Sequence, residues 1–154
     1  MSTSYIRKEL VRLLRSGGAH ASFDDIISGF PSKFHGVKPH GAPHTAWQLL
    51  EHLRLAEWDI VEYTRDARHV ALKFPDEYWP QTDEPPDRKS WVASVAAFKK
   101  GLRAMEQLVE DMQKDIFAAL PHGNGETIYS QALLLIDHNS YHYGQLMLIR
   151  RALV

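Results

Sequence analysis

Apolar residues recur along the chain at steps of three and four, which is the spacing of one buried face of an α-helix. The clearest run keeps this spacing without a slip and consists of Val95, Phe98, Leu102, Met105, Val109, Met112 and Ile116. Similar patterns cover residues 4–16, 45–67 and 126–153, and a short helical piece lies within 22–30. No segment alternates apolar and polar residues in the manner of a strand. The pattern predicts an all-α protein.

Capping and helix-breaking residues indicate how these helices connect. Thr45 with Gln48, and Ser22 with Asp25, have the spacing of capping boxes at helix starts. Gly17-Gly18 breaks the first helix, the Pro- and Gly-rich residues 31–44 form a loop, and the sequence PHGNG (121–125) ends the third long helix. Residues 69–89 contain four prolines and form a long connection. We expect one domain over residues 1–154, a four-helix bundle with a broken first helix and a long crossover between helices two and three.

Composition and charge restrict the classes of function. The 154 residues carry 18 basic and 19 acidic side chains, a formal net charge of −1, which argues against a nucleic-acid partner. No apolar run reaches the length needed to span a bilayer. The first ten residues, MSTSYIRKEL, carry charges where a signal peptide requires an apolar stretch. We therefore expect a cytoplasmic protein that does not enter a membrane.

Cysteine is absent and histidine is abundant. With no cysteine, the chain has no disulfide, thiol nucleophile or Cys-based zinc site. The nine histidines leave imidazole, carboxylate and water as ligands for any metal ion. A candidate site must therefore be sought among the histidines.

Two histidines, His138 and His142, lie four residues apart in the last predicted helix and so share one face of it. Five neighbours lie within about a quarter turn of that stripe and indicate that it is buried: Leu134, Leu135, Tyr141, Leu146 and Ile149. A second pair at the same spacing, His40 and His44, encloses Gly41 and Pro43 and belongs to a loop. A histidine pair alone favours a structural role, satisfied in the core or partly exposed, over a metal site.

A third histidine extends the pair to a candidate metal site. His52 lies within the second long helix, flanked at helical spacing by Leu49, Leu55 and Ala56. In helix bundles, metal sites are built from side chains that project inward from facing helices. A set of three histidines leaves positions for water or substrate, which is typical of a catalytic metal. Buried imidazoles without a metal would each need a hydrogen-bond partner.

The segments GAPHTAWQLLEHLRLAEWD and DHNSYHYGQLMLIRRAL resemble the DinB-like superfamily, which includes bacillithiol- and mycothiol-dependent transferases. The residues that match its histidine motifs are His52, His138 and His142, with Gly144 and Gln145 completing the second motif. The resemblance covers nearly the whole chain. It implies a four-helix bundle, a divalent metal ion such as nickel or zinc, and a homodimer.

For several other residues near the histidines, both a functional and a purely structural role are considered. Glu51 and Asp137 each precede a candidate ligand and either orient an imidazole or lie on a solvated face, and the solvated face is favoured. Tyr141 either donates a hydrogen bond to a bound substrate or packs against neighbouring side chains, and packing is favoured. Gly144 indicates a closely approaching helix, and Gln145 a hydrogen bond in the core. The acidic segment 83–91 forms either a lid, with Arg88 meeting an anionic substrate, or an exposed linker.

Two classes of function remain open. The first is a divalent-metal-dependent enzyme that acts on a small-molecule substrate, either as a hydrolase or as a transferase that uses a low-molecular-weight thiol cosubstrate. The second is a non-catalytic, stress-associated metal-binding dimeric bundle. Open coordination positions in a concave pocket would favour the enzyme, and a closed shell with a fourth protein ligand would favour the second class.

Overall fold

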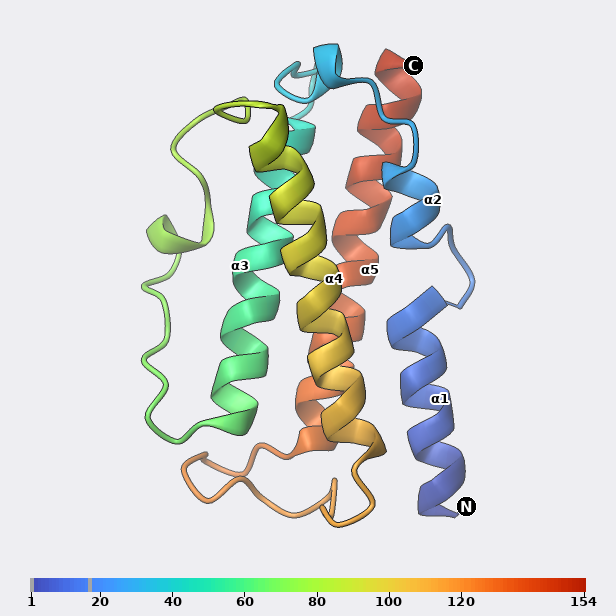
Figure 1. The fold of residues 1–154 in the computed structure, drawn as a ribbon, viewed down its shortest axis with the longest axis vertical. Helices are drawn as coiled ribbons and strands as arrows, with labels where there is room; N and C mark the ends of the chain where they lie inside the picture. Colours follow the sequence, from blue (N-terminus) through green and yellow to red (C-terminus); the bar gives the residue numbers. More distant parts are fainter. Residues whose placement is uncertain (1, 17) are drawn as a thin grey trace.

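Five α-helices make up the fold of the residues that the computed structural model describes, 2–16 and 18–154 (Figure 1). They are α1 (Thr3–Ser16), α2 (Phe23–Ile27), α3 (Ala46–Arg65), α4 (Arg88–Glu110) and α5 (Ile128–Leu153), with short 3-10 turns η1 (Ser32–Phe34) and η2 (Asp76–Tyr78). No strand occurs in these described ranges, so the all-α prediction is confirmed. None of the helices found there is both long and apolar enough to cross a lipid bilayer.

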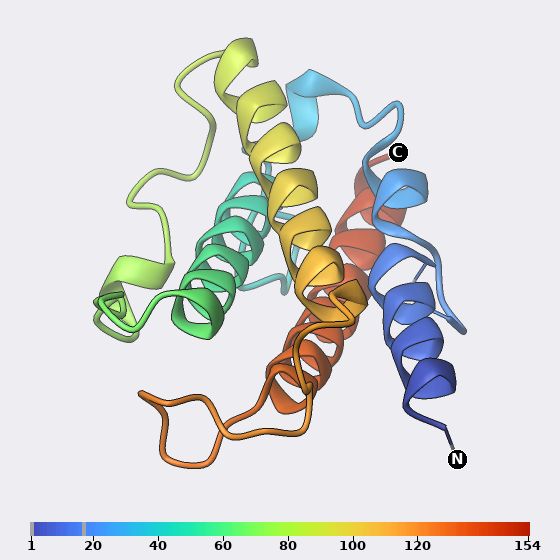
Figure 2. The same ribbon diagram turned by 60° about the horizontal axis from the view of Figure 1, so that its bottom comes forward.

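The long helices lie side by side, as two views show (Figures 1 and 2). α3 packs against both α4 and α5, and α1 packs against the same two helices. α2 follows α1 along one side of the molecule and contacts α5. Gly18, with φ +74°, lies at the predicted break between α1 and α2, whereas Gly17 is outside the described residues. The predicted long connection between α3 and α4 carries η2, which packs on α3.

Helix caps set where α3 begins. The Thr45 hydroxyl accepts a hydrogen bond from the Gln48 backbone N–H, and the Gln48 side chain accepts one from the Thr45 N–H, as the sequence predicted. The same reciprocal pair joins Ser22 and Asp25 at the start of α2. Since the cap fixes the first turn, it also fixes which α3 residues face the interior, and His52 is among them.

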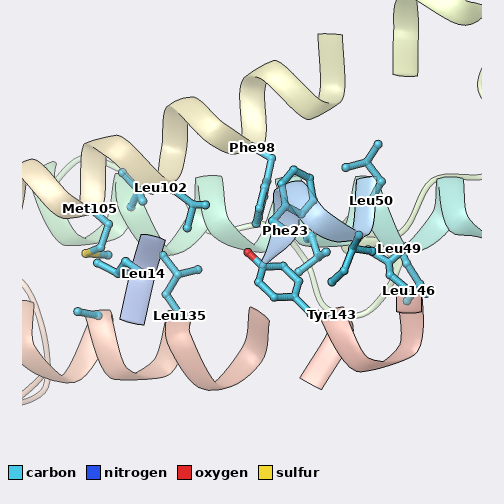
Figure 3. Close-up of a cluster of buried hydrophobic side chains, with 14 of the residues drawn as sticks. Leu14, Phe23, Leu49, Leu50, Phe98, Leu102, Met105, Leu135, Tyr143 and Leu146 are labelled. Carbon is cyan, nitrogen blue, oxygen red and sulfur yellow. The ribbon is translucent and has the colours of Figure 1, made fainter. Parts of the chain in front are cut away.

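The core is formed by apolar residues from all five helices (Figure 3). Leu50 of α3, Phe98 of α4 and Leu146 of α5 are fully buried, and Phe23 of α2 packs on Phe98 with ring centroids 4.4 Å apart. Tyr143 of α5 lies against the same two phenylalanines. These contacts join α2, α4 and α5, while α3 packs against α5 in the same core, and the three histidines lie between α3 and α5.

The third long helix ends earlier than the sequence pattern predicted. α4 stops at Glu110, so the expected end near Pro121 is wrong, and Met112 is 74% exposed instead of continuing the seam. The guanidinium of Arg7, buried on α1, donates to the backbone carbonyls of Val109, Asp111 and Lys114. These bonds satisfy carbonyls that lack a partner at a helix C-terminus, and so they stabilise the early end. Ile116 is buried, but from the irregular segment that follows.

Candidate metal centre

The three predicted histidines meet between α3 and α5. The Nε2 atom of His52, on α3, lies 3.1 Å from the Nε2 atoms of both His138 and His142, on α5. His52 and His142 are 6% and 7% exposed, and His138 is half-buried. Among the described residues, this cluster is the group of side chains able to hold a metal ion. The grouping inferred from the sequence is therefore present in the fold.

Hydrogen bonds on the far side of two rings fix which nitrogen faces the centre. His52 Nδ1–H donates to the backbone carbonyl of Tyr78 at 2.9 Å, and His142 Nδ1–H donates to Gln145 Oε1 at 2.7 Å. A neutral imidazole protonated on Nδ1 carries its lone pair on Nε2. Two lone pairs therefore face each other at 3.1 Å, an arrangement that a cation bound between them would stabilise.

A proton does not fill that role at neutral pH, because burial lowers the pKa of His52 and of His142 to about 4. Burial also lowers the pKa of His138. Two nitrogens held about 2.1 Å from one divalent ion lie roughly 3.0–3.4 Å apart at bond angles of about 90–110°. The 3.1 Å separations match this range, so the three residues fit a divalent metal ion.

The connection between α3 and α4 covers one of the three histidines. The indole of Trp79 stacks on the His52 ring with centroids 3.9 Å apart and an interplanar angle of 3°. His44, from the loop before α3, stacks on the same indole at 4.0 Å. An aromatic cover of this kind limits the access of water to the His52 ring and restricts its rotation. The Tyr78 carbonyl and Trp79 thus fix the ring from its edge and its face.

The histidine stripe borders the buried face of α5 instead of lying at its middle. Leu135, Leu146 and Ile149 are buried as expected, but Leu134 is 49% exposed and Tyr141 is 66% exposed. Their expected burial is wrong because the neighbouring helices cover only one side of the stripe. The His142 ring contacts the exposed Tyr141 ring edge-on at 4.9 Å. One side of the centre is consequently open toward solvent.

Of the four other residues considered near the histidines, Glu51 and Gly144 differ from expectation, whereas Asp137 and Gln145 agree with it. Glu51 is buried, not solvated, because its carboxylate pairs with the Arg54 guanidinium at 2.8 Å, and it contacts no ligand histidine. Asp137 is exposed, as favoured. Gly144 is exposed, and a Cβ added there would meet nothing within 4 Å, so close packing of another helix within the chain is wrong. Gln145 makes the expected hydrogen bond, to His142.

The acidic segment 83–91 is anchored at the start of α3. Thr45 Oγ1 donates to the Asp83 carbonyl at 2.6 Å, and Gln48 Nε2 donates to Asp83 Oδ1 at 2.8 Å. Arg88 is exposed at the first turn of α4. The part of the connection that reaches the centre is Tyr78–Trp79, which precedes the segment considered as a lid or a linker.

Sequence reasoning missed the residues that support the ligands. The loop histidines His40 and His44 stay outside the metal cluster, as expected. No role at the histidines was predicted for Tyr78, Trp79 or Asp59, although a buried Asp59 binds the same connection. The only signal was the aromatic pair within a proline-rich loop, and nothing in the sequence assigned that pair to α3.

Comparison with known proteins identifies the family of the chain. Searches of curated proteins and of solved structures found no match. A family model described as the DinB superfamily matches residues 18–146, a span that contains all three histidines and the connection that covers them. The match covers most of the chain, and the chain therefore belongs to the DinB superfamily.

Proposed function

We propose that this DinB-superfamily protein is a divalent-metal-dependent enzyme whose ion, zinc or nickel, is held by His52, His138 and His142. The observation that carries the proposal is the pair of Nε2 lone pairs of His52 and His142, which face each other at 3.1 Å in rings whose Nδ1–H groups are already engaged. Imidazole nitrogen is a preferred ligand of both ions.

The ligand set supports an enzyme over a purely structural metal site. Within the described ranges, no carboxylate joins the three histidines as a fourth ligand. Three protein ligands leave positions for water or substrate, whereas structural zinc sites are closed by four. The exposed side of the stripe, near Tyr141, gives such a ligand a way in.

A cavity beside the centre supports a small organic substrate. It has a volume of about 460 Å³, within the usual size range of small-molecule sites. Leu49 lies one turn before His52 on α3, and Gln145 one turn after His142 on α5, and both line the cavity. The cavity therefore continues the seam between α3 and α5 beyond the histidines, under the loop of residues 39–44. Its walls are mostly apolar and hold no carboxylate, which favours a neutral or anionic substrate with an apolar part.

When bound, the ion supplies a Lewis acid that activates a water or a low-molecular-weight thiol. The chain's own residues prepare the site for this chemistry. Tyr78 and Gln145 hold His52 and His142 in the ligating tautomer, and Trp79 shields the His52 ring from water. Hydrolysis and thiol transfer both fit these residues. The alternative is a non-catalytic, stress-associated metal-binding dimer.

The proposal extends to the bundle architecture and to the oligomeric state. The packing of α1 and α3 against both α4 and α5 supports a four-helix bundle whose first helix is broken into α1 and α2. A homodimer is part of the same proposal. The sequence suggests it because four large aromatic side chains, Trp58, Trp79, Trp91 and Phe117, exceed the interior room of a small bundle. Trp58 and Phe117 are exposed and support it, whereas Trp91 is buried and Trp79 is half-buried.

Elemental analysis of protein purified without a metal-affinity tag tests the metal site. We expect one divalent ion per chain, and its loss in His52→Ala, His138→Ala and His142→Ala. His40→Ala, a loop variant, serves as the matched control and should keep the ion. If His138→Ala and His142→Ala retain full metal content while the loop variant loses it, the proposed site is wrong.

A substrate screen then separates the reactions. The metal-loaded protein is tested for ester and amide hydrolysis, and for transfer of glutathione, bacillithiol or mycothiol to organic electrophiles. Activity in either arm that is lost with the metal supports the enzyme. A loaded protein that is inactive in both arms, and whose metal lacks exchangeable water, supports the non-catalytic alternative.

A further inference from the structure

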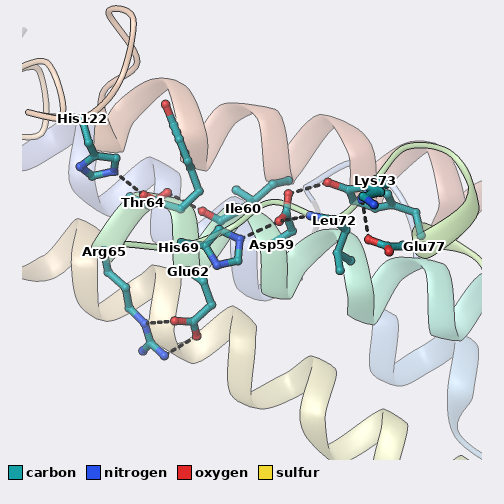
Figure 4. A network of polar contacts seen from close by, with 12 residues as sticks. Asp59, Ile60, Glu62, Thr64, Arg65, His69, Leu72, Lys73, Glu77 and His122 are labelled. Atoms are coloured by element: carbon teal, nitrogen blue, oxygen red, sulfur yellow. Dashed lines mark hydrogen bonds and ion pairs between the residues drawn. The ribbon is translucent and has the colours of Figure 1, made fainter. Parts of the chain in front are cut away.

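A buried carboxylate, Asp59, binds the connection that covers the metal centre (Figure 4). Asp59 lies on α3 seven residues after His52, which is two helical turns along the same face. Its Oδ1 accepts hydrogen bonds from His69 Nε2–H at 2.7 Å and from the Leu72 backbone N–H at 3.3 Å, and its Oδ2 accepts one from the Tyr78 hydroxyl at 2.6 Å. Three donors from one loop thus converge on one side chain of α3.

Tyr78 links this carboxylate to the metal centre. Its hydroxyl donates to Asp59, while its backbone carbonyl accepts the Nδ1–H of His52 at 2.9 Å. The next residue, Trp79, stacks on the His52 ring. Burial, followed by the hydrogen bond to Asp59, raises the pKa of the Tyr78 hydroxyl, so that it remains a donor. One residue therefore joins two points on α3 that are two turns apart.

The position of the Tyr78 carbonyl decides the tautomer of His52. A loop carbonyl can fix an imidazole only if the loop itself is fixed, and η2 is a single short turn with no side-chain cap. The Tyr78 hydroxyl bond to Asp59 attaches this turn to α3 at a second point, two helical turns from His52. Without it, the carbonyl and the indole would lose their common anchor.

We propose that Asp59 is a positioning residue for the metal centre: acting through the Tyr78 hydroxyl, it holds the carbonyl that keeps His52 in its ligating tautomer and the indole that covers the ring. The inference rests on the proposed function, because it assigns Asp59 to the same site. Outer residues that orient ligating histidines typically change metal affinity by about 10–100-fold when replaced.

Metal affinity tests the proposal in two variants of the full chain. Tyr78→Phe removes one oxygen and leaves the backbone carbonyl, and Asp59→Asn removes the charge. We expect each to weaken zinc binding by about 10–100-fold, and the double variant to be little weaker than either, because both act through one contact. Glu62→Gln is the matched control. It changes another α3 carboxylate, one paired with Arg65, and should bind zinc as the unaltered protein does.

A spectroscopic measurement separates positioning from simple anchoring of the loop. In metal-free protein, ring ¹⁵N–¹H correlations of His52 report which nitrogen carries the proton. We expect the Nδ1–H form in the unaltered protein and in Glu62→Gln, and a mixture of both tautomers in Tyr78→Phe and Asp59→Asn. If Asp59→Asn does not fold, Tyr78→Phe carries the test, since it removes a single oxygen.

The outcomes distinguish this inference from the proposed function. If the unaltered protein binds no divalent ion, the proposed function fails, and the His52 tautomer alone decides whether Asp59 positions the ring. If the protein binds zinc, but Tyr78→Phe and Asp59→Asn keep both the affinity and the tautomer, the inference is overturned even if they unfold at a lower temperature. Weaker binding together with mixed tautomers supports it.

Discussion

Acid should release the bound ion only well below the ordinary pKa of histidine, about 6.5. A protonated imidazole cannot bind a metal, so metal affinity falls as pH drops through the pKa of each free ligand. Burial lowers the pKa of His52 and of His142 to about 4. Both rings therefore stay neutral across the range in which ordinary histidines become charged, and protons begin to compete with the metal only near pH 4.

The size of the effect follows from these values. At pH 5, a ring with a pKa of about 4 is still about 90% neutral, so two such rings reduce affinity by only about 1.2-fold relative to pH 7. Two rings with the ordinary pKa would reduce it by roughly 600-fold over the same interval. Burial also lowers the pKa of His138, so this ring likewise makes metal affinity less sensitive to acid than an exposed histidine would.

Competition with a chromophoric chelator at pH 7, 6 and 5 measures this dependence, after correction for protonation of the chelator. The His40→Ala variant, measured in parallel, excludes a contribution from a loop histidine. A loss of several hundred-fold in affinity between pH 7 and pH 5 would refute the reasoning, since it would mean that the ligand rings titrate as if exposed. The metal-free protein gives a second readout. Its stability should fall as pH drops below about 6.5, because the unfolded chain then binds protons that the buried rings do not.

Further predictions concern packing and assembly. Gly101→Ala should lower the free energy of unfolding by about 1–3 kcal/mol, because the new Cβ would lie 2.1 Å from Glu57 Oε1. In a Glu57→Ala background the same change should instead stabilise by up to about 1 kcal/mol, and denaturant unfolding of the four proteins checks this reversal. Burial raises the pKa of Glu57, so stability should fall as pH rises above about 4.5, and Glu57→Gln should remove that slope. Gly144→Ala should stabilise the chain by about 0.5–1 kcal/mol because its Cβ meets open space, and a loss of stability would indicate a partner packed there. Light scattering should give a dimer, and a monomer at high micromolar concentration would remove that prediction.

Much of the fold followed from local signals. The start of α3 was predictable because Thr45 and Gln48 satisfy each other's backbone groups within one turn, with no help from the rest of the chain. The end of α4 was not, since the apolar spacing continues through Met112 while the helix stops at Glu110. The bonds that stabilise this end come from Arg7, more than a hundred residues away in sequence. The spacing of apolar residues cannot predict such a long-range contact.

By itself, the sequence determined the all-α class and the three histidines that meet. Residues four apart on a helix share a face whatever surrounds them, so His138 and His142 were paired by the geometry of α5 alone. Only the tertiary structure decided what surrounds the rings. The Tyr78 carbonyl, the Trp79 indole and the Asp59 carboxylate reach His52 through an irregular connection, whose path depends on long-range hydrogen bonds and not on a repeating pattern. The pairing of His138 and His142 could therefore be inferred from spacing, whereas the residues that orient and cover the rings depend on how distant segments pack together.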